Sequence, residues 1–429
     1  MSNNKIKIKR KDIASIVEAG LKKRRAKEAR FRAVGMAAVI TGLIMLAILL
    51  SSIIFTGMPA FTQTAVKLDF NIDQSLFADS APTEEMIRKA DFHGLVKQTL
   101  REKYPQVKSR GDKKALYTLI SSGTSYQLRD MIIEDPSLVG TTVSVWVLAD
   151  DEVDSFFKGS KTIEHTRLTE KQLGWIKQLV AEDRIKTRFN WTFLSNGDSR
   201  EPEQSGIRGA IMGSFFVVIV TLLLSFPMGV AAAIYLEEYA PENRWTDLIE
   251  ININNLAAVP SIVFGLLGLA VYINFLGMPR SAPLVAGLVL TLMTLPTIII
   301  ASRAALKSVP PSLREAALGL GASKMQMIFH HVLPEAMPGM LTGSIIGMAQ
   351  ALGESAPLLM IGMVAFIVEI PQGFLDPATV LPVQIYLWAD SPEQAFLERT
   401  AAAIMVLLLF LVVMNLLAVW LRKKFEKRW

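Results

Sequence analysis

The sequence predicts an all-α integral membrane protein with six transmembrane helices and a small α+β domain inserted after the first of them. Three observations carry this prediction. Hydrophobic residues make up 51% of the 429 residues, and the mean hydropathy is +0.36. Several apolar stretches reach the length of about 20 residues that a helix needs to cross a bilayer. Lysine and arginine gather beside these stretches, as they do on the cytoplasmic side of a membrane.

Residues 1–32 form a basic arm with twelve Lys or Arg residues against three Asp or Glu residues. The first span follows at Ala33–Phe55. It is longer than the apolar core of about 7–15 residues in a cleavable signal peptide, so we expect a retained anchor. Because basic flanks mark the inside, we expect the arm in the cytoplasm, beside membrane lipid and without a role in binding nucleic acid.

Residues 56–206 have a different character, with 20 Lys or Arg, 22 Asp or Glu and no stretch able to span. One span separates them from the cytoplasmic arm, so we expect a water-soluble domain in the periplasm. Helical periodicity over Glu84–Tyr104 and alternation over Thr141–Leu148 predict a mixture of helices and strands. We expect a further strand at Phe189–Leu194, entering a turn at Asn196 and Gly197.

Residues 207–421 contain the remaining spans. We expect five, at Ile207–Leu236, Leu248–Ile273, Ala282–Ser302, Gly339–Val368 and Thr400–Leu421. Six spans return both termini to the cytoplasm. The tail of residues 422–429 agrees, with five Lys or Arg against one Asp or Glu, and the outer loop Glu369–Glu398 has neither Lys nor Arg.

Several kinds of chemistry are not expected. The chain has no cysteine, which excludes disulfides and thiolate sites. Its four histidines, His93, His165, His330 and His331, show no spacing typical of metal ligands. A phosphate-binding loop of the form G-x-x-x-x-G-K-[ST] is also missing, so we expect no catalytic residue, no cofactor, no metal and no ATP hydrolysis by this chain.

The cytoplasmic loop of residues 304–338 has the pattern of two short helices joined by a glycine turn. Pro311 suits a first helical turn, and Gly321 can adopt the left-handed conformation that ends a helix. Ser323 and Gln326 form a capping-box pattern for the second helix, which we expect Pro334 to close. Such a loop makes a compact protrusion suited to docking into a partner.

This loop resembles the EAA loop of ABC importer permeases, whose pattern is E-A-A-x-x-x-G, nine residues, then I-x-L-P. The matching residues are Glu315, Ala316, Ala317, Gly321, Leu333 and Pro334, and His331 stands at the isoleucine position. In that family the loop seats in an ATPase subunit. The resemblance therefore implies an ABC importer permease fold, a dimer of ATPase subunits as partner, and these six residues as the coupling residues.

Two further segments indicate which class of solute is transported. Gly353–Leu359 is similar to the G-E-[ST]-A-P-L-L signature of phosphate-uptake permeases of the PstA type, and Pro260–Leu266 resembles them too. The resemblance implies transport of inorganic phosphate across a bacterial inner membrane. It also implies a second permease of the PstC type and a periplasmic phosphate-binding protein as partners. The domain at 56–206 resembles the extra N-terminal domain of some bacterial phosphate permeases.

The fifth span carries features of a transport path. Gly339, Gly343 and Gly347 recur at a spacing that lets another helix approach closely. Gln350 and Glu354 continue this face, so we expect Glu354 to point into protein.

An ionisable residue at mid-span is a functional candidate. Pro357 frees the carbonyl of Gly353, so we expect the helix to break beside Glu354. We assign Glu354, Ser355, Gln350 and Arg303 to the substrate path. A structural ion pair of Glu354 with a neighbouring helix stays an open alternative.

Two other functions are considered. A permease for molybdate or sulphate would share the coupling loop, but the glutamate favours phosphate, because a carboxylate accepts a hydrogen bond from a protonated oxyanion and sulphate has no proton to give. A membrane receptor that senses a ligand through residues 56–206 would need an output domain. The cytoplasmic segments offer only the arm, the loop and the short tail.

Overall fold

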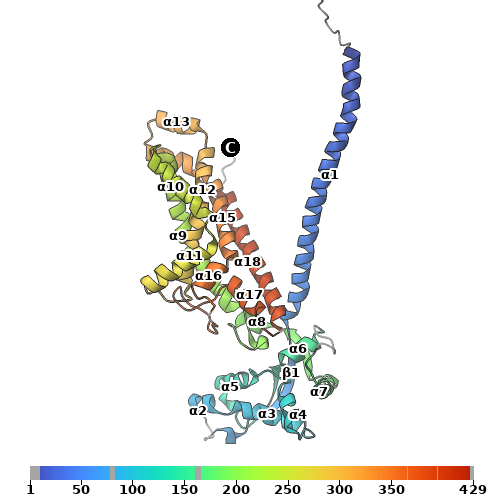
Figure 1. Ribbon diagram of the computed structural model, residues 1–429. Helices are drawn as coiled ribbons and strands as arrows, with labels where there is room; N and C mark the ends of the chain where they lie inside the picture. Colours follow the sequence, from blue (N-terminus) through green and yellow to red (C-terminus); the bar gives the residue numbers. More distant parts are fainter. Residues whose placement is uncertain (1–9, 78–82, 160–165, 365, 394, 426–429) are drawn as a thin grey trace, which may run out of the picture. The chain divides into compact units, whose positions relative to one another are not determined.

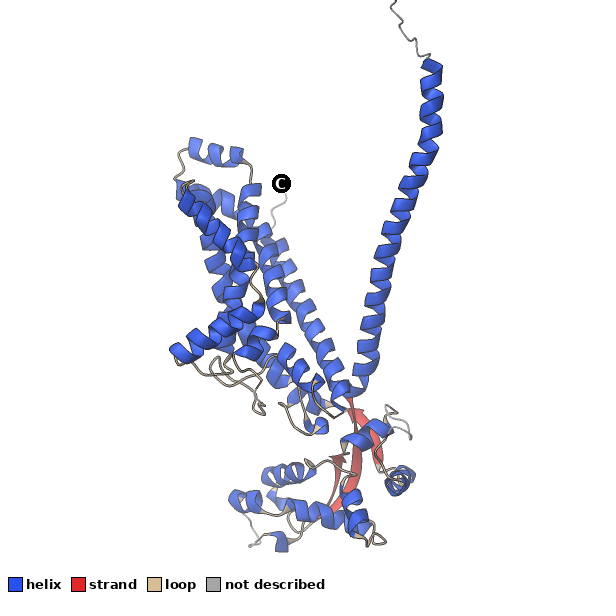
Figure 2. Cartoon of the chain, viewed as in Figure 1, coloured by secondary structure: helices blue, strands red, loops and turns tan. Residues whose placement is uncertain are grey.

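The computed structural model describes residues 10–77, 83–159, 166–364, 366–393 and 395–425 (Figure 1). Helices predominate in this part of the chain, and its strands form one three-stranded sheet (Figure 2). The chain divides into two compact units, residues 1–55 and 56–429, and each is described by itself.

Helix α1, Arg10–Gly57, makes up the described part of the first unit and ends just inside the second. A candidate membrane span lies within Lys23–Phe61. The span expected at 33–55 lies within this candidate, and the helix also continues back through the basic arm to Arg10. Lysine, arginine, alanine and glutamate are strong helix formers, which explains the extension.

Residues 56–206 contain the sheet. Strand β1, Thr62–Asn71, lies between β2, Thr142–Leu148, and β3, Ile185–Phe189, and is antiparallel to both. Because β1 is central, most of its residues are buried, and they join a single apolar core with the surrounding helices. The strand expected at Thr141–Leu148 is confirmed as β2.

Seven helices accompany the sheet in the described part of this domain. They are α2 Glu84–Lys89, α3 Phe92–Lys103, α4 Arg110–Tyr117, α5 Thr124–Glu134, α6 Asp151–Phe157, α7 Glu170–Ala181 and α8 Trp191–Ser195. The helical prediction for 84–104 is confirmed, with a break between α2 and α3. The strand expected at 189–194 is wrong beyond Phe189, because the side chain of Asn190 accepts from the backbone N–H of Phe193 (2.9 Å) and starts α8.

The remaining helices belong to a bundle. They are α9 Arg208–Ile234, α10 Arg244–Ala257, α11 Ser261–Gly268, α12 Pro283–Ser308, α13 Pro311–Gly319, α14 Lys324–Met327, α15 Leu333–Gly353, α16 Ala356–Met360, α17 Leu381–Ala389 and α18 Ala395–Phe425. Helix α12 is the centre of the bundle, since it packs against α9, α10, α11 and α15. Three π-helical turns, Tyr235–Tyr239, Leu269–Phe275 and Ile328–Val332, extend or join these helices.

The expected count of six spans is not confirmed by the described residues. Four helices are long and apolar enough to cross a membrane, and the pair α10 and α11 makes a fifth only if a bend of 99° is counted within one span. Pro260 lies at this bend and cannot donate a backbone hydrogen bond, so the helix expected over 248–273 is broken there. The helix expected over 339–368 ends at Gly353.

Helix α15 lies close to α12 through its glycines. A Cβ atom at Gly343 would lie 2.1 Å from the Cβ of Ala301, and one at Gly339 would lie 2.7 Å from the Cβ of Ala305. The expectation that these glycines permit close helix approach is therefore confirmed. Gly347 has only ordinary van der Waals contacts, so a side chain there would fit without displacing α12.

Candidate functional site

The loop between α12 and α15 begins with α13 and ends that helix with a glycine. Gly321 has φ +86°, and its N–H donates to the carbonyl of Leu318 (2.9 Å) while the N–H of Ala322 donates to Ala317 (3.1 Å). This pair of bonds is a Schellman motif, which requires the left-handed conformation at Gly321. The glycine turn predicted from the sequence is confirmed.

The second helix of the loop starts as expected and ends differently. Ser323 and Gln326 form a reciprocal capping box at the start of α14. Pro334 does not close the helix. A π turn at Ile328–Val332, in which the N–H of Leu333 donates to the carbonyl of Ile328, carries α14 directly into α15. The wider turn places Pro334 near the N-terminus of α15, where its missing N–H is tolerated.

The six residues predicted for coupling differ in exposure. Ala317 is buried in an apolar cluster with residues of α12 and the π turn. Leu333 and Pro334 are half-buried, while Glu315, Ala316 and Gly321 are exposed. The buried alanine thus holds α13 onto the bundle, and its exposed neighbours are available to a partner.

Arg314 is the residue of this loop that sequence reasoning missed. Its guanidinium donates to the carboxylate of Glu238 through Nε (3.1 Å) and Nη2 (2.9 Å). It also donates to the carbonyl oxygens of Leu306 (2.9 Å) and Val309 (2.7 Å), at the C-terminal end of α12. The side chain of Glu238 is 7% exposed. One arginine therefore joins α13 to α12 and to the π turn after α9.

Charge-assisted bonds to a half-buried fork of this kind are among the stronger polar contacts in proteins. The arginine also supplies donors at the end of α12, where it shares the carbonyl of Leu306 with the N–H of Val309 and bonds the carbonyl of Val309. The sequence gives little indication of the contact between Arg314 and Glu238. Arg314 and Glu238 are 76 residues apart, and a charge next to Glu315 looks like a solvated helix face.

The outer surface of the loop is apolar. Large hydrophobic side chains are exposed on α13, the glycine turn, α14 and the π turn: Leu318, Leu320, Met325 and Phe329. Leu320, next to Gly321, is 90% exposed. An apolar surface on a rigid protrusion is a feature of protein interfaces.

The two segments of the predicted solute signature meet in the bundle. Gly265 in α11 packs against α16, and a Cβ atom there would lie 2.6 Å from the carbonyl oxygen of Pro357 and 2.7 Å from its Cα. Phe264 and Leu358, the neighbours of these two residues, belong to one buried apolar cluster. The sequence did not indicate that these segments, more than 80 residues apart, touch.

Glu354 lies where α15 ends, as predicted. It has extended backbone angles (φ −83°, ψ 118°) and follows the last helical residue, Gly353. Its side chain is half-buried, and among the described residues its carboxylate has no hydrogen-bond or ion-pair partner. Ser355 is half-buried beside it, and Gln350 is exposed rather than covered by the chain itself. An ionisable side chain without a counter-charge therefore lies at the point where α15 ends.

Arg303 is not available as an anion attractor. Its Nη2 atom lies 2.5 Å from the carboxylate of Glu250 in α10, and its Nε lies 3.5 Å from Glu237. Lys307 also approaches Glu237 (3.7 Å). Two carboxylates therefore compensate the charge of Arg303, which ties α12 to α10 and to the π turn after α9. The expectation of Arg303 in a substrate path loses its physical basis.

The described residues contain no group of three or more His, Asp or Glu side chains that could hold a metal ion. His165 lies outside the described residues.

Comparison with known proteins places the chain among transport proteins. Residues 225–429 match the model of the binding-protein-dependent transport system inner membrane component, and residues 18–166 match a domain of unknown function, DUF3333. The probable ABC transporter permease protein YqgI of Bacillus subtilis is 30% identical over 257 residues, which are 56% of this chain and 86% of that protein.

The phosphate transport system permease protein PstA 1 of Mycobacterium tuberculosis is 33% identical over 232 residues, which are 54% of this chain and 75% of that protein. Among solved structures, an inward-facing MetNI methionine ABC transporter matches 52% of this chain and 96% of its own, with 19% identity and a TM-score of 0.42.

Proposed function

The chain belongs to the family of binding-protein-dependent transport system inner membrane components, and we propose that it is a permease subunit of an ATP-driven importer of inorganic phosphate. One observation carries the proposal. The two signature segments meet at Gly265 and Pro357, beside the uncompensated carboxylate of Glu354. The name of the mycobacterial relative, a phosphate transport system permease protein, supports the same cargo.

The loop between α12 and α15 is the docking element in this proposal, and a dimer of ATPase subunits is its partner. The exposed apolar side chains around Gly321 supply the contact surface, with Glu315 and Ala316 exposed beside them. Ala317, through its buried contacts, and Gly321, through its left-handed backbone conformation, fix the shape of the loop. Leu333 and Pro334 lie at its base, where the loop becomes α15.

In this proposal Arg314 transmits movement of the loop to the helix bundle. Because its guanidinium bonds both to Glu238 and to the end of α12, a force on α13 acts directly on α12, the central helix of the bundle. ATP hydrolysis in the partner then moves the spans through a stiff polar contact, and no long flexible segment intervenes.

Glu354, Ser355 and Gln350 are the proposed cargo contacts. The carboxylate of Glu354 accepts a hydrogen bond from a protonated phosphate oxygen, while the hydroxyl of Ser355 and the amide of Gln350 donate to the other oxygens. Sulphate, which is fully ionised, offers the carboxylate no proton, so the site discriminates against it. We propose that a second permease of the PstC type packs over the exposed face that carries Gln350. We also propose that a periplasmic phosphate-binding protein delivers phosphate to the complex.

The proposed orientation in the bacterial inner membrane has both termini in the cytoplasm and residues 56–206 in the periplasm. The basic flanks support it. The chain has no native cysteine, so single cysteines report directly on sidedness. A membrane-impermeant thiol reagent added outside is expected to label Lys177→Cys, on the exposed face of α7, and to spare Glu242→Cys, in the loop before α10. The opposite pattern would reverse the orientation.

The function is tested by purifying the tagged chain from its native membrane, identifying its partners and reconstituting the complex in liposomes. We expect a co-purifying ATPase and a second permease, and ATP-dependent accumulation of radiolabelled phosphate in the presence of the binding protein. Accumulation of sulphate or molybdate instead would overturn the cargo and leave the permease assignment standing. Purification without any ATPase would contradict both.

A further inference from the structure

Helix α8 is tied to the ends of two candidate membrane spans. Just before it, the N–H of Asn190 donates to the carbonyl oxygen of Phe61 (2.8 Å), the last residue of the first candidate span. Just after it, the N–H of Arg208, which begins the next candidate span, donates to the carbonyl oxygen of Asn196 (3.1 Å). Helix α8 therefore lies beside the surface at which these candidate spans end.

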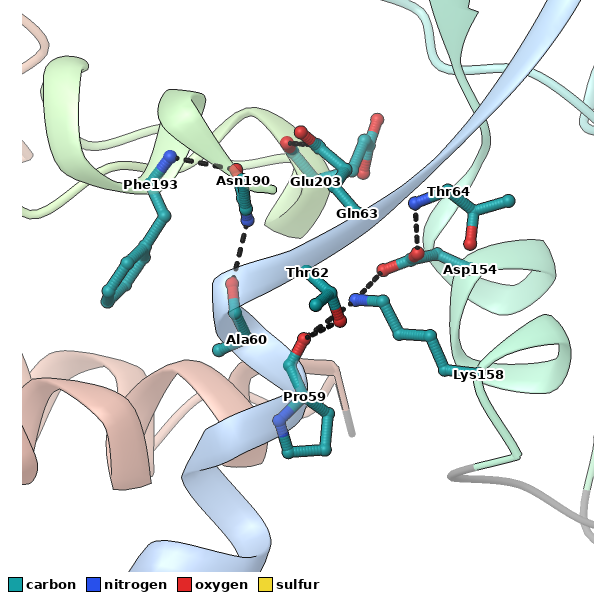
Figure 3. A network of polar contacts seen from close by, with 10 residues as sticks. All are labelled: Pro59, Ala60, Thr62, Gln63, Thr64, Asp154, Lys158, Asn190, Phe193 and Glu203. Carbon is teal, nitrogen blue, oxygen red and sulfur yellow. Dashed lines mark hydrogen bonds and ion pairs between the residues drawn. The ribbon is translucent and has the colours of Figure 1, made fainter. Parts of the chain in front are cut away.

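The side chain of Asn190 fixes this arrangement (Figure 3). It donates to the carbonyl oxygen of Ala60 (2.9 Å) and accepts from the N–H of Phe193 (2.9 Å). Lys158 in α6 adds a second link, because its ammonium donates to the carbonyl oxygen of Pro59 (3.0 Å). Asn190 is only 1% exposed, so α8 cannot leave the end of the span without breaking buried hydrogen bonds.

One side of α8 is buried at the point where a third candidate span begins. The ring of Phe193 belongs to an apolar cluster with Ala60, with Ile207 next to α9 and with Phe396 at the start of α18. Helix α18 contains the candidate span Ala395–Lys424. The position of α8 is therefore set by packing against three span ends.

Two aromatic rings next to this buried side are exposed. Phe189 ends β3 and is 49% exposed, and Trp191 begins α8 and is 70% exposed. Their ring centroids lie 4.9 Å apart, with an angle of 67° between the ring planes. Among the described residues of 62–206, the other large hydrophobic side chains that are exposed are Tyr126 and Val180. The two rings thus form an apolar surface of the domain beside the span ends.

The kind of side chain indicates what covers this surface. Tryptophan and other aromatic residues are enriched at the boundary between membrane and water. An indole ring suits that boundary because its apolar body enters the acyl region while its N–H bonds to headgroups or water. A ring pair fixed beside three span ends lies at this depth, where phospholipid surrounds a membrane protein.

The charges near the rings also favour phospholipid. Lys186 and Arg188 are exposed in the same strand, and in the described part of the chain neither makes an ion pair. Their cationic groups stack on Trp146, 4.0 Å and 4.4 Å from its ring centroid. Because attraction to anionic headgroups extends over a Debye length of about 8–10 Å, both residues contribute from either face of the strand.

We propose that Phe189 and Trp191 form an interfacial anchor that inserts into the headgroup region of the bilayer. The covering ligand is phospholipid, with the rings at the level of the glycerol groups and Lys186 and Arg188 attracting the phosphates. The anchor holds the domain of residues 56–206 against the membrane surface, so the domain does not swing freely from the first span. This inference is independent of the solute that the chain transports.

The anchor is tested by photocrosslinking the full chain in its native membrane. Trp191→benzoylphenylalanine keeps an aromatic side chain and, on illumination, bonds to whatever covers the position. We expect the peptide to gain the mass of a phospholipid, with a yield at least about tenfold above that of Tyr126→benzoylphenylalanine, an exposed aromatic position in α5. Crosslinks mainly to another protein, equal lipid yields at the two positions, or no lipid adduct at Trp191 would each overturn the anchor.

The contribution of the ring to stability is measured separately, by hydrogen exchange at residues 189–195 of the full chain in phospholipid nanodiscs. Trp191→Ser is expected to speed exchange there by about tenfold or more, because the ring loses its burial in lipid. Val180→Ser is the matched control in α7, where the side chain is 51% exposed. Exchange in α7 is expected to stay within about threefold of the parent chain. Unchanged exchange in Trp191→Ser would show that the ring lies in water and would overturn the anchor.

Discussion

Gly265 in α11 lies directly against Pro357 in α16, so close that a Cβ atom on the glycine would lie 2.6 Å from the proline's carbonyl oxygen. Neither partner can yield easily, because the nearest atoms belong to backbone. We predict that Gly265→Ala separates the two helices, displaces Glu354 and lowers phosphate uptake by about tenfold or more, a loss in the range of overpacked cores. Uptake is measured at matched membrane levels of the chain.

Gly174→Ala is the control for this substitution. Gly174 lies in α7, and no atom would lie within 4 Å of its new Cβ. That variant is expected to transport normally and to unfold at the same temperature or slightly higher. Normal uptake in Gly265→Ala would show that the contact between the signature segments is dispensable.

Gly321→Val is predicted to uncouple ATP hydrolysis from uptake. At φ +86° a residue with a branched Cβ is strained by roughly 1–2 kcal/mol, so the turn distorts and α13 no longer seats in its partner. Gly321→Asn is the matched comparison, because asparagine tolerates the left-handed region better and there is open space around the position. The measured quantity is phosphate transported per ATP hydrolysed. Equal ratios in the two variants would contradict a role for the backbone conformation.

Arg314→Ala and Glu238→Ala are predicted to weaken coupling to similar extents. Each removes one side of the same charge-assisted contact, so the double variant should be little worse than Arg314→Ala alone. The readouts are ATPase stimulation by loaded binding protein and retention of the ATPase during purification. Arg244→Ala, in an exposed position at the start of α10, serves as the control and should behave as the parent chain. Losses that simply add would argue that the two residues act separately.

Glu354→Gln and Glu354→Leu are predicted to assemble normally and to transport phosphate poorly. A hydrogen bond to a charged group contributes about 1.5–3 kcal/mol, so uptake should fall roughly tenfold to a hundredfold. The glutamine variant should admit sulphate relatively better, since the negative charge is gone. The described residues offer the carboxylate no cationic partner, so failure of Glu354→Leu to assemble would reveal a structural role instead. Unchanged uptake in either variant would remove Glu354 from the cargo site.

Asp150→Asn is predicted to flatten the pH dependence of the stability of the domain of residues 56–206. Burial, followed by the nearby charge of Asp151, raises the pKa of Asp150 from 3.8 to about 8. The folded domain therefore keeps a proton that the unfolded chain releases, and stability falls as pH rises from about 4 to about 8. Asparagine has no such proton. Unfolding followed by hydrogen exchange at β2 should show a smaller decrease in stability between pH 5 and pH 8 in the variant.

The local features of the coupling loop followed from its sequence. Pro311 begins α13, Gly321 ends it in the left-handed conformation, and Ser323 caps the next helix. Each of these features depends on residues within one or two helical turns, and their side-chain chemistry fixes the backbone there. The helix break beside Glu354 was predictable for the same reason, since Pro357 lies only three residues away.

Hydrophobic patterning by itself indicated the class of protein, an apolar first segment long enough to span and a following stretch at 56–206 of different character. Tertiary structure alone decided the pairings of charge: Arg314 with Glu238, and Arg303 with Glu250 and Glu237, are separated by more than 50 residues along the chain. It also decided the 99° bend after α10 and the passage of α14 into α15 through Pro334. The sequence around a charged residue does not indicate which residue will neutralise its charge. That partner depends on which helices pack together and exclude water from the contact.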